Sequence, residues 1–176
     1  MTQTAVFGGG CFWCTEAIFK SLKGVESVLP GYAGGKMTHP TYYDVSEGGT
    51  GHAEVIKIEF DPTIIPYADL LDVFWHTHNP TSLNRQGNDV GTQYRSVILY
   101  TSEEQKKIAE ESLKKLIDSK TYESSVVTEI KALDTFYEAE SYHKDYYAKH
   151  SDDPYCEVII SPKLQKLREK YSDKLK

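Results

Sequence analysis

The sequence predicts an α+β fold: a two-layer split βαβ (ferredoxin-like) sheet with helices on one face and long functional loops. Short apolar runs alternate with amphipathic stretches, so the first six elements follow the order strand, helix, strand, strand, helix, strand. Two long polar, glycine-rich segments interrupt this series and are expected at the rim of the sheet. The 176 residues contain no repeat, low-complexity tract or linker, which favours one domain over residues 1–176.

The N-terminal elements follow from local patterns. Thr4–Phe7 is an apolar run typical of a strand and leads into Gly8-Gly9-Gly10. Cys14–Lys23 carries apolar residues at helical spacing and is followed by Gly24, a residue that commonly ends helices. Val25–Tyr32 is a second apolar run and predicts the next strand.

The middle of the chain contains the first of the two polar segments. Gly34–Gly51 lacks periodicity but keeps several aromatic residues, so we interpret it as a functional loop. Alternate residues of Ala53–Phe60 are apolar, which predicts a strand closed by Asp61-Pro62. Tyr67–Thr77 has an apolar face at helical spacing and predicts a helix.

The second polar loop, Asn79–Thr92, precedes an apolar strand at Arg95–Tyr100. Ser102 is a good N-cap for a helix over Ser102–Asp118, whose acidic first turn suits the positive end of a helix. The residues of this helix expected to face the core are Leu113, Leu116 and Ile117.

The C-terminal part is predicted to contain a strand at Val126–Ala132, a helix at Glu138–Lys149 and a last helix at Pro162–Lys174. Ser161–Lys176 has six basic and two acidic side chains, although the chain as a whole is acidic. Such a tail is usually a solvated helix face rather than a docking site.

Charge and cysteine content exclude several classes of protein. With 20 basic and 26 acidic residues the net charge is −6, so the chain has no overall positive charge that would attract nucleic acid or an anionic membrane. The longest uncharged stretch, Met1–Thr15, is too short and too glycine-rich to span a bilayer and lacks the basic start of a signal peptide. Three cysteines are too few for a disulfide scaffold. We therefore expect a cytoplasmic monomer whose cysteines take part in chemistry.

Tyrosine is the commonest aromatic residue, with 13 Tyr against 6 Phe and 2 Trp. A residue that only fills a core does not need a hydroxyl group. The excess indicates aromatic surfaces that also form hydrogen bonds.

The segment Gly8-Gly9-Gly10-Cys11-Phe12-Trp13-Cys14 lies between a predicted strand and a predicted helix. Glycine lets the backbone adopt positive φ and approach a ligand closely. Cys11 would lie at the helix N-terminus, where free N–H groups and the helix dipole stabilise a thiolate. The bulky Phe12 and Trp13 are expected to wall a pocket. The segment therefore predicts a nucleophilic cysteine.

Other interpretations of this segment stay open. Cys11 and Cys14 could share a zinc ion with His76 and His78, although the spacing fits no common structural zinc pattern. An anion-binding glycine loop lacks the residues of the known phosphate motifs. A glutaredoxin-like dithiol explains the cysteines but leaves the two polar loops without a role. A non-catalytic module could bind peptides in an aromatic groove and use its cysteines as a redox or zinc switch.

Glu54 has the parity of the apolar residues in its predicted strand, including Ile56 and Ile58. A carboxyl group aimed at a core loses hydration, which raises its pKa and keeps it protonated near pH 7. Such a group could donate a proton to a leaving oxygen beside a thiolate. The alternative is a solvated residue at the end of a strand. The side chains of Asn88, Asp89 and Tyr94, in the polar stretch Arg85–Arg95 that begins within the second loop, could likewise bind a polar substrate group or only one another.

Several motifs together resemble the peptide methionine sulfoxide reductase A family. They occur in the family's order and with nearly fixed spacing between Val6 and Cys156. The motifs are Gly9-Gly10-Cys11-Phe12-Trp13, Gly31-Tyr32-Ala33-Gly34-Gly35, Pro40-Thr41-Tyr42, Thr50-Gly51-His52-Ala53-Glu54 and Gly87-Asn88-Asp89-Val90-Gly91-Thr92-Gln93-Tyr94-Arg95.

The resemblance implies reduction of the S-epimer of methionine sulfoxide, free or in proteins, with no metal or organic cofactor and with thioredoxin as reductant. It implies that Cys11 attacks the sulfoxide sulfur and becomes a sulfenic acid. Glu54 would protonate the sulfoxide oxygen, and Tyr42 and Tyr94 would donate hydrogen bonds to it.

The same resemblance assigns the rest of the pocket. Phe12 and Trp13 would hold the S-methyl group, Asp89 would position and polarise the substrate, and Tyr146 is a further pocket tyrosine.

The chain departs from the family pattern in the residues that would regenerate the thiol. Cys156 resembles the C-terminal resolving cysteine, although one residue is inserted between Tyr146 and Cys156, and the additional tail cysteine of some members is missing. Cys14 stands where many members have glycine. We expect Cys156 to resolve the sulfenic acid, with Cys14 as a second candidate one helical turn from Cys11. Direct reduction of the sulfenic acid is a third route.

Overall fold

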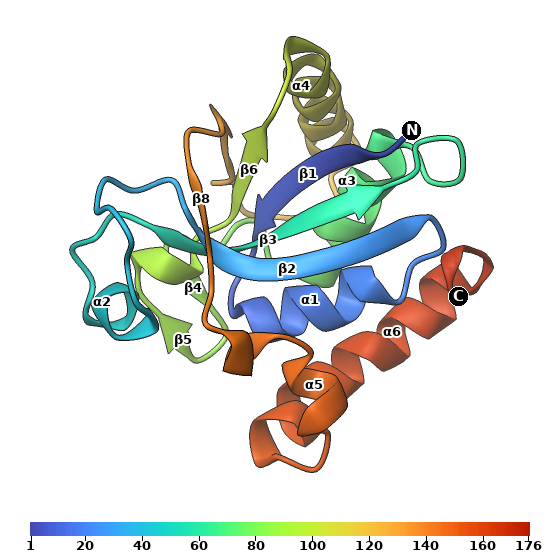
Figure 1. The fold of residues 1–176 in the computed structure, drawn as a ribbon. Coiled ribbons are helices and arrows are strands. Elements are labelled where there is room, and N and C mark those ends of the chain that lie inside the picture. The colour runs from blue at the N-terminus through green and yellow to red at the C-terminus, as the bar shows by residue number, and fades with distance from the viewer.

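The computed structural model describes all 176 residues and has a six-stranded mixed sheet at its centre (Figure 1). The strands are β1 (Gln3–Gly8), β2 (Val25–Ala33), β3 (Ala53–Phe60), β4 (Arg85–Gln86), β5 (Asp89–Val90), β6 (Val97–Tyr100), β7 (Glu129–Ala132) and β8 (Phe136–Glu138). The order across the sheet is β7-β6-β1-β3-β2-β8, and β4 and β5 form a separate hairpin. The four central strands, β6-β1-β3-β2, are antiparallel, whereas β7 joins β6 in parallel.

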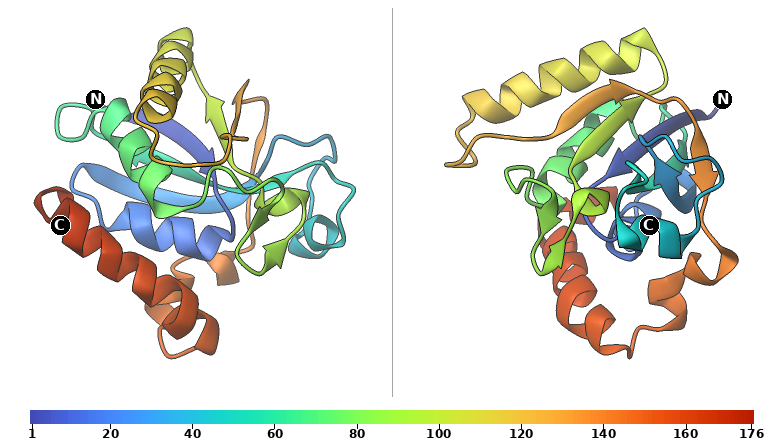
Figure 2. Two further views of the ribbon diagram at one scale, coloured as in Figure 1. Left: turned by 180° about the vertical axis from the view of Figure 1, so that it is seen from behind. Right: turned by 90° about the vertical axis from the view of Figure 1, so that its left-hand side faces the viewer.

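The helices lie around this sheet and at its ends (Figure 2). They are α1 (Phe12–Lys20), α2 (Tyr42–Glu47), α3 (Tyr67–Thr77), α4 (Glu103–Asp118), α5 (Tyr146–Lys149) and α6 (Ser161–Tyr171), with short turns of helix at η1 (Thr92–Tyr94), η2 (Ser141–His143), η3 (Cys156–Ile160) and η4 (Ser172–Lys174). The α+β class is therefore confirmed. None of the helices combines the length and apolarity needed to cross a lipid bilayer.

The main core lies between one face of the sheet and the helices. Phe7 of β1 and Ile56 of β3 belong to a buried cluster of 30 residues to which α1, α3, α4 and α6 contribute. The other face has a cluster of only six residues, over which Leu133 and Phe136 pack. Burial of apolar area on the helical face therefore supplies most of the hydrophobic stabilisation.

Local patterns predicted most of the central elements. Ala53–Phe60 and Tyr67–Thr77 form the strand and the helix expected there. Ser102 caps α4 as predicted, because its side chain accepts a hydrogen bond from the backbone N–H of Gln105. One assignment within α4 is wrong: Ile117 is 55% exposed, although Leu116 is buried.

The predicted helix at Glu138–Lys149 is wrong. The segment contains the end of β8, the single turn η2 and the four residues of α5. Asp145 has φ of +55°, a left-handed conformation that interrupts a right-handed helix. Contacts with distant parts of the chain hold this conformation, and they are described below.

The two polar loops also contain structure that periodicity did not indicate. The helix α2 lies within Gly34–Gly51, and its N-cap Thr41 forms a reciprocal capping box with Asp44. The β4–β5 hairpin lies within Asn79–Thr92. Both segments carry residues of the candidate site.

Candidate active site

Cys11 is the N-cap of α1 and lies half-buried where β1 ends, as predicted. The turn between strand and helix requires Gly10, whose φ of +95° is unfavourable for other residues. The helix end does not stabilise the thiolate of Cys11 enough to offset its burial in the substrate-free protein. Burial raises the pKa of Cys11 well above its ordinary value and the nearby Glu54 adds to this, whereas a hydrogen bond from the Trp13 N–H lowers it. The resting group is therefore a thiol.

Glu54 is buried beside the same helix end, with only 1% of its surface exposed. Its Oε1 accepts a hydrogen bond from the backbone N–H of Phe12 at 3.1 Å. Burial raises the pKa of Glu54 to about 8, with a further contribution from Asp89 and an opposing one from the Phe12 N–H. The predicted burial of this carboxyl group is confirmed. At neutral pH it holds a proton.

Tyr42 and Tyr94 come from the two polar loops and meet the Cys11–Glu54 pair. Tyr42 is the first residue of α2, and Tyr94 ends η1. Burial raises the pKa of Tyr42 to about 12, helped by the charges of Glu54 and Cys11. Burial, followed by the charge of Glu54, also raises the pKa of Tyr94. Both phenols remain protonated hydrogen-bond donors at neutral pH.

An aromatic cluster lies next to these polar groups. Phe12 is fully buried, and the ring of Trp13 stacks on Tyr146 with centroids 3.7 Å apart and planes 4° apart. The indole N–H of Trp13 donates to His143 Nδ1 at 3.0 Å. Since Nδ1 accepts this hydrogen bond, the ring proton of neutral His143 is on Nε2. The His143 ring in turn lies 4.5 Å from that of Tyr42. The orientation of Trp13 is thus set from two sides.

Asp89 is linked to Cys14 through Tyr155. The Tyr155 hydroxyl donates to Asp89 Oδ2 at 2.8 Å and lies 3.6 Å from Cys14 Sγ. Because the hydroxyl proton points to Asp89, the Cys14 thiol donates to the Tyr155 oxygen. The pKa of Cys14 is raised by burial, against which the positive charge of Lys163 acts.

Cys156 lies in the main core at the start of η3, with 0% of its surface exposed. Burial raises its pKa, followed by the negative charges of Asp153 and Cys14. All three cysteines are free thiols. The electrostatic neighbours of Cys11 include Cys14, and those of Cys156 also include Cys14. The thiol of Cys14 therefore lies near both of the others.

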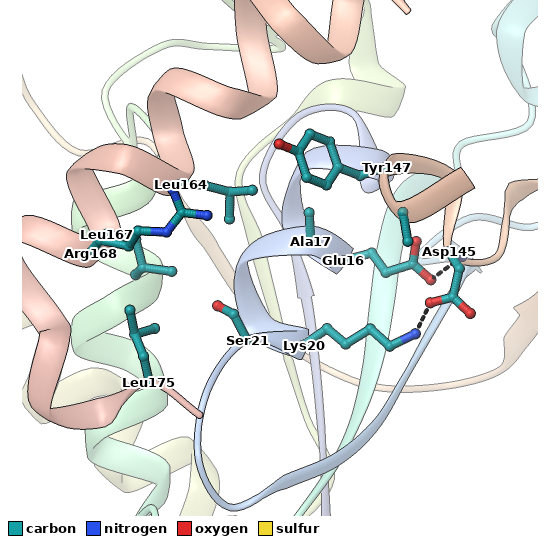
Figure 3. A pocket seen from close by; sticks show the side chains of 11 residues that line it. Glu16, Ala17, Lys20, Ser21, Asp145, Tyr147, Leu164, Leu167, Arg168 and Leu175 are labelled. Carbon is teal, nitrogen blue, oxygen red and sulfur yellow. Dashed lines mark hydrogen bonds and ion pairs between the residues drawn. The ribbon is translucent and has the colours of Figure 1, made fainter. Parts of the chain in front are cut away.

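The segment with Tyr146 is held by a buried acid on α1. Glu16 Oε2 accepts a hydrogen bond from the Asp145 N–H at 3.0 Å, and Lys20 forms an ion pair with the Asp145 carboxylate. Figure 3 shows Glu16 and Lys20 extending from α1 toward Asp145, across from Leu164 at the other wall of a cavity of about 270 Å³. Burial raises the pKa of Glu16 to about 7. These contacts fix the backbone immediately before Tyr146.

Glu140 connects the candidate site to the sheet. Its Oε1 accepts from the Tyr32 hydroxyl and its Oε2 from the Tyr42 N–H, each at 2.8 Å. Three residues with contacts at the site, Glu140, His143 and Glu16, were not predicted from the sequence. Glu16, a charged residue among apolar neighbours in a predicted amphipathic helix, carried a detectable signal. The others lie in a segment without useful periodicity.

His76 and His78, the histidines considered as zinc ligands, lie within hydrogen-bond distance of other groups of the protein. His78 Nδ1 lies 2.6 Å from Phe74 O and its Nε2 lies 2.8 Å from Ser96 Oγ, and burial lowers the pKa of His78 to about 3. His76 Nδ1 lies 2.8 Å from Asp72 O. No group of three or more His, Cys, Asp or Glu side chains is arranged to hold a metal ion.

Comparisons with known proteins agree with one another. Residues 3–175 match the family model described as peptide methionine sulfoxide reductase. The chain is 56% identical to peptide methionine sulfoxide reductase MsrA of Saccharolobus solfataricus over 174 residues, 99% of this chain and 97% of that protein. It also resembles the crystal structure of Mxr1 from Saccharomyces cerevisiae in reduced form, with a TM-score of 0.82 and 32% identity over 88% of this chain and 89% of that chain. For methionine sulfoxide reductase A of Corynebacterium diphtheriae the TM-score is 0.75 and the identity 34%, over 85% of this chain and 75% of that chain.

Proposed function

The chain belongs to the peptide methionine sulfoxide reductase family and is an oxidoreductase; on that premise we propose that it reduces the S-epimer of methionine sulfoxide, free or in proteins, to methionine. One observation carries this proposal. A buried, protonated Glu54 and the thiol of Cys11 lie at the same end of α1. A nucleophile beside a desolvated acid is what the removal of a sulfoxide oxygen needs, because that oxygen leaves only when it is protonated.

In the proposed first step the sulfur of Cys11 attacks the sulfoxide sulfur, while Glu54 gives its proton to the oxygen. The oxygen passes to Cys11 as the sulfur–oxygen bond of the substrate breaks. The products are methionine and the sulfenic acid of Cys11, so the substrate sulfur gains two electrons and the cysteine sulfur loses two. The proton of the original thiol returns to the Glu54 carboxylate.

The neighbouring side chains have supporting roles in this proposal. Tyr42 and Tyr94 donate hydrogen bonds to the sulfoxide oxygen, for which their raised pKa values keep them protonated. The rings of Phe12 and Trp13 hold the S-methyl group, and Tyr146 supports Trp13 by stacking on it. The last group, Asp89, positions and polarises the substrate.

The thiol is regenerated in two further steps. We propose that Cys156 attacks the sulfenic acid to give a disulfide and water, with Cys14 as the second candidate. The dithiol of thioredoxin then reduces the disulfide. Mxr1, a structural relative, has itself been solved in complex with Trx2, which supports the choice of reductant. No metal or organic cofactor takes part in these steps.

The decisive test is steady-state turnover with dithiothreitol and separated sulfoxide epimers. We expect loss of the S-epimer, no loss of the R-epimer, and no turnover by Cys11→Ser. Full activity of Cys11→Ser would contradict the proposal. Reduction of a glutathione mixed disulfide without any reaction of sulfoxides would instead indicate a glutaredoxin-like enzyme.

Some expectations go beyond these findings and stay proposals. From the antiparallel order β6-β1-β3-β2 we infer that the sheet is the predicted split βαβ, ferredoxin-like arrangement. We likewise propose one domain over residues 1–176, a monomer and a cytoplasmic location.

A further inference from the structure

A cleft of about 980 Å³ opens onto Cys11 and Cys14 and is bordered by α6. In Figures 1 and 2, α6 runs beside α1, at whose start these two cysteines lie. Neither Glu54 nor the phenols of Tyr42 and Tyr94 line this cleft. The cleft is therefore distinct from the part of the candidate site that Glu54, Tyr42 and Tyr94 form, although Cys11 borders it.

The α6 wall of the cleft carries a row of lysines. Lys163, Lys166 and Lys170 all line it, and their spacing of three and four residues places them on one face of the helix. None of the three forms an ion pair, and Lys166 and Lys170 are exposed. Three unpaired cations on one face contrast with the net charge of −6 of the chain.

The cleft is lined by these three lysines against two carboxylates, Asp89 and Glu169, so the charge of its lining is still positive overall. Asp89 accepts a hydrogen bond from the Tyr155 hydroxyl and Glu169 accepts one from the Gln165 amide, and neither carboxylate forms an ion pair with a lysine. His78 is neutral because burial lowers its pKa to about 3, and His76 Nδ1 is occupied by Asp72 O. The three lysines are thus available to bind an anion outside the protein.

The size of the cleft indicates the kind of occupant. Pockets for small molecules have volumes of roughly 300–1,000 Å³, and the side chain of methionine sulfoxide fills only a small part of such a space. When that side chain reaches Cys11, the polypeptide on either side of it must lie against the surface next to Cys11. Carboxylates on that polypeptide would complement the three lysines.

We propose that Lys163, Lys166 and Lys170 bind acidic residues flanking the oxidised methionine of a polypeptide, so that the protein favours sulfoxides in acidic segments. This inference rests on the proposed reduction of methionine sulfoxide. It differs from the expectation that the basic C-terminal segment is only a solvated face.

Two peptides of equal length test it, one with Asp and Glu around an S-sulfoxide and one with Ser and Gln, each reduced with dithiothreitol at low salt. We expect kcat/KM to be about fivefold higher for the acidic peptide, mainly through KM, because exposed ion pairs contribute little individually. The variant Lys166→Gln/Lys170→Gln, which leaves Lys163 beside Cys14 unchanged, should lose most of this preference and keep its activity on free methionine sulfoxide. High salt should remove the preference of the unmodified protein.

The matched control changes two exposed lysines of α4 that do not line the cleft, as Lys107→Gln/Lys114→Gln. It should keep the preference. Equal turnover of both peptides by the unmodified protein would overturn the inference. It would also be overturned if the α6 variant changed only the KM for thioredoxin, because the lysines would then bind the reductant. If the unmodified protein reduced neither the peptides nor free methionine sulfoxide, the proposed function itself would be rejected.

Discussion

Glu54 and Cys11 depend on the same end of α1, and their protonation states are linked. The Phe12 N–H, one of the free donors of that helix end, binds Glu54. A charged Glu54 is one of the causes that raise the pKa of Cys11. When Glu54 is protonated, this obstacle to thiolate formation is absent and the acid needed by the oxygen is present. Both requirements of the proposed step therefore favour the neutral carboxyl group.

The protonation of Glu54 predicts the pH dependence of the reductase step. Because the pKa of Glu54 is about 8, the rate of methionine formation in a single turnover should fall as the pH rises through 8. Glu54→Gln should lower this rate by about 10²–10⁴-fold, the usual contribution of general acid catalysis, and should lack the dependence. Measurements at pH values on both sides of 8 check this. A mild effect would leave Glu54 as a structural residue.

Glu59→Gln is the matched control, since Glu59 lies on the opposite face of β3 and accepts from the Thr4 hydroxyl. It should leave the pH profile unchanged.

The pH dependence of the free energy of unfolding gives an independent measure of the Glu54 pKa. The pKa of Glu54 is raised in the folded state from 4.5 to about 8, so its stabilising effect is full below about pH 4.5 and is lost progressively as the pH rises from there to about 8. Denaturant unfolding should show this loss in the unmodified protein but not in Glu54→Gln.

The position of the helix α2 depends on a residue that belongs neither to α2 nor to the sheet. Glu140, between β8 and η2, accepts hydrogen bonds from the hydroxyl of Tyr32 in β2 and from the first N–H of α2 at Tyr42. The carboxylate therefore joins the sheet to the helix that carries a proposed substrate-binding phenol. Its pKa is lowered because the hydrogen bonds from Tyr42 and Tyr32 outweigh its partial burial.

We predict that Glu140→Ala destabilises the protein by about 1–3 kcal/mol, since it leaves the Tyr32 hydroxyl and the Tyr42 N–H without their partner. It should also lower kcat/KM for sulfoxides by displacing Tyr42. Glu138→Ala, which removes only a surface ion pair with Lys144, should cost less than about 1 kcal/mol. Denaturant unfolding and steady-state kinetics measure both variants.

A double-mutant cycle separates positioning from general destabilisation. If Glu140 acts through Tyr42, then Glu140→Ala should reduce kcat/KM little further in a Tyr42→Phe background. Additive effects would show that Glu140 stabilises the fold without positioning the phenol.

Over the whole molecule, the two candidate disulfides differ in how much of the chain they enclose. Cys14 is one helical turn from Cys11, whereas Cys156 lies in the core near the other end of the chain. A bond between Cys11 and Cys14 requires the first turn of α1 to relax. Loop-closure entropy predicts stabilisation of about 2 kcal/mol for the short loop and about 5 kcal/mol for the long one.

We predict that one equivalent of sulfoxide, added without reductant, yields a Cys11–Cys156 peptide pair. The oxidised protein should then unfold at higher urea concentration than oxidised Cys156→Ser, in which only the short loop can form. Peptide mapping and urea unfolding check this, with Cys14→Ser expected to behave like the unmodified protein. A Cys11–Cys14 pair in the unmodified protein would identify Cys14 as the resolving residue.

Local sequence patterns were sufficient where neighbours in the chain determine the outcome. The strand before Gly10 and the helix after it placed Cys11 at a helix start, and the alternation in β3 placed Glu54 on the buried face. The motifs, through their family resemblance, added Tyr42 and Tyr94, which periodicity could not select from the polar loops. The roles of these residues in catalysis are still predictions.

The sequence by itself determined the central elements, the position of the thiol and the burial of the carboxyl group, because each depends on the local period of apolar residues. Only the tertiary structure decided the course of the chain between β7 and α5. There Glu140 binds Tyr32 over 108 residues of sequence, His143 binds Trp13 over 130, and Asp145 binds Glu16 over 129. A hydrogen bond between residues so far apart in the chain leaves no periodic signal, yet its energy outweighs the weak helix preference of a short segment.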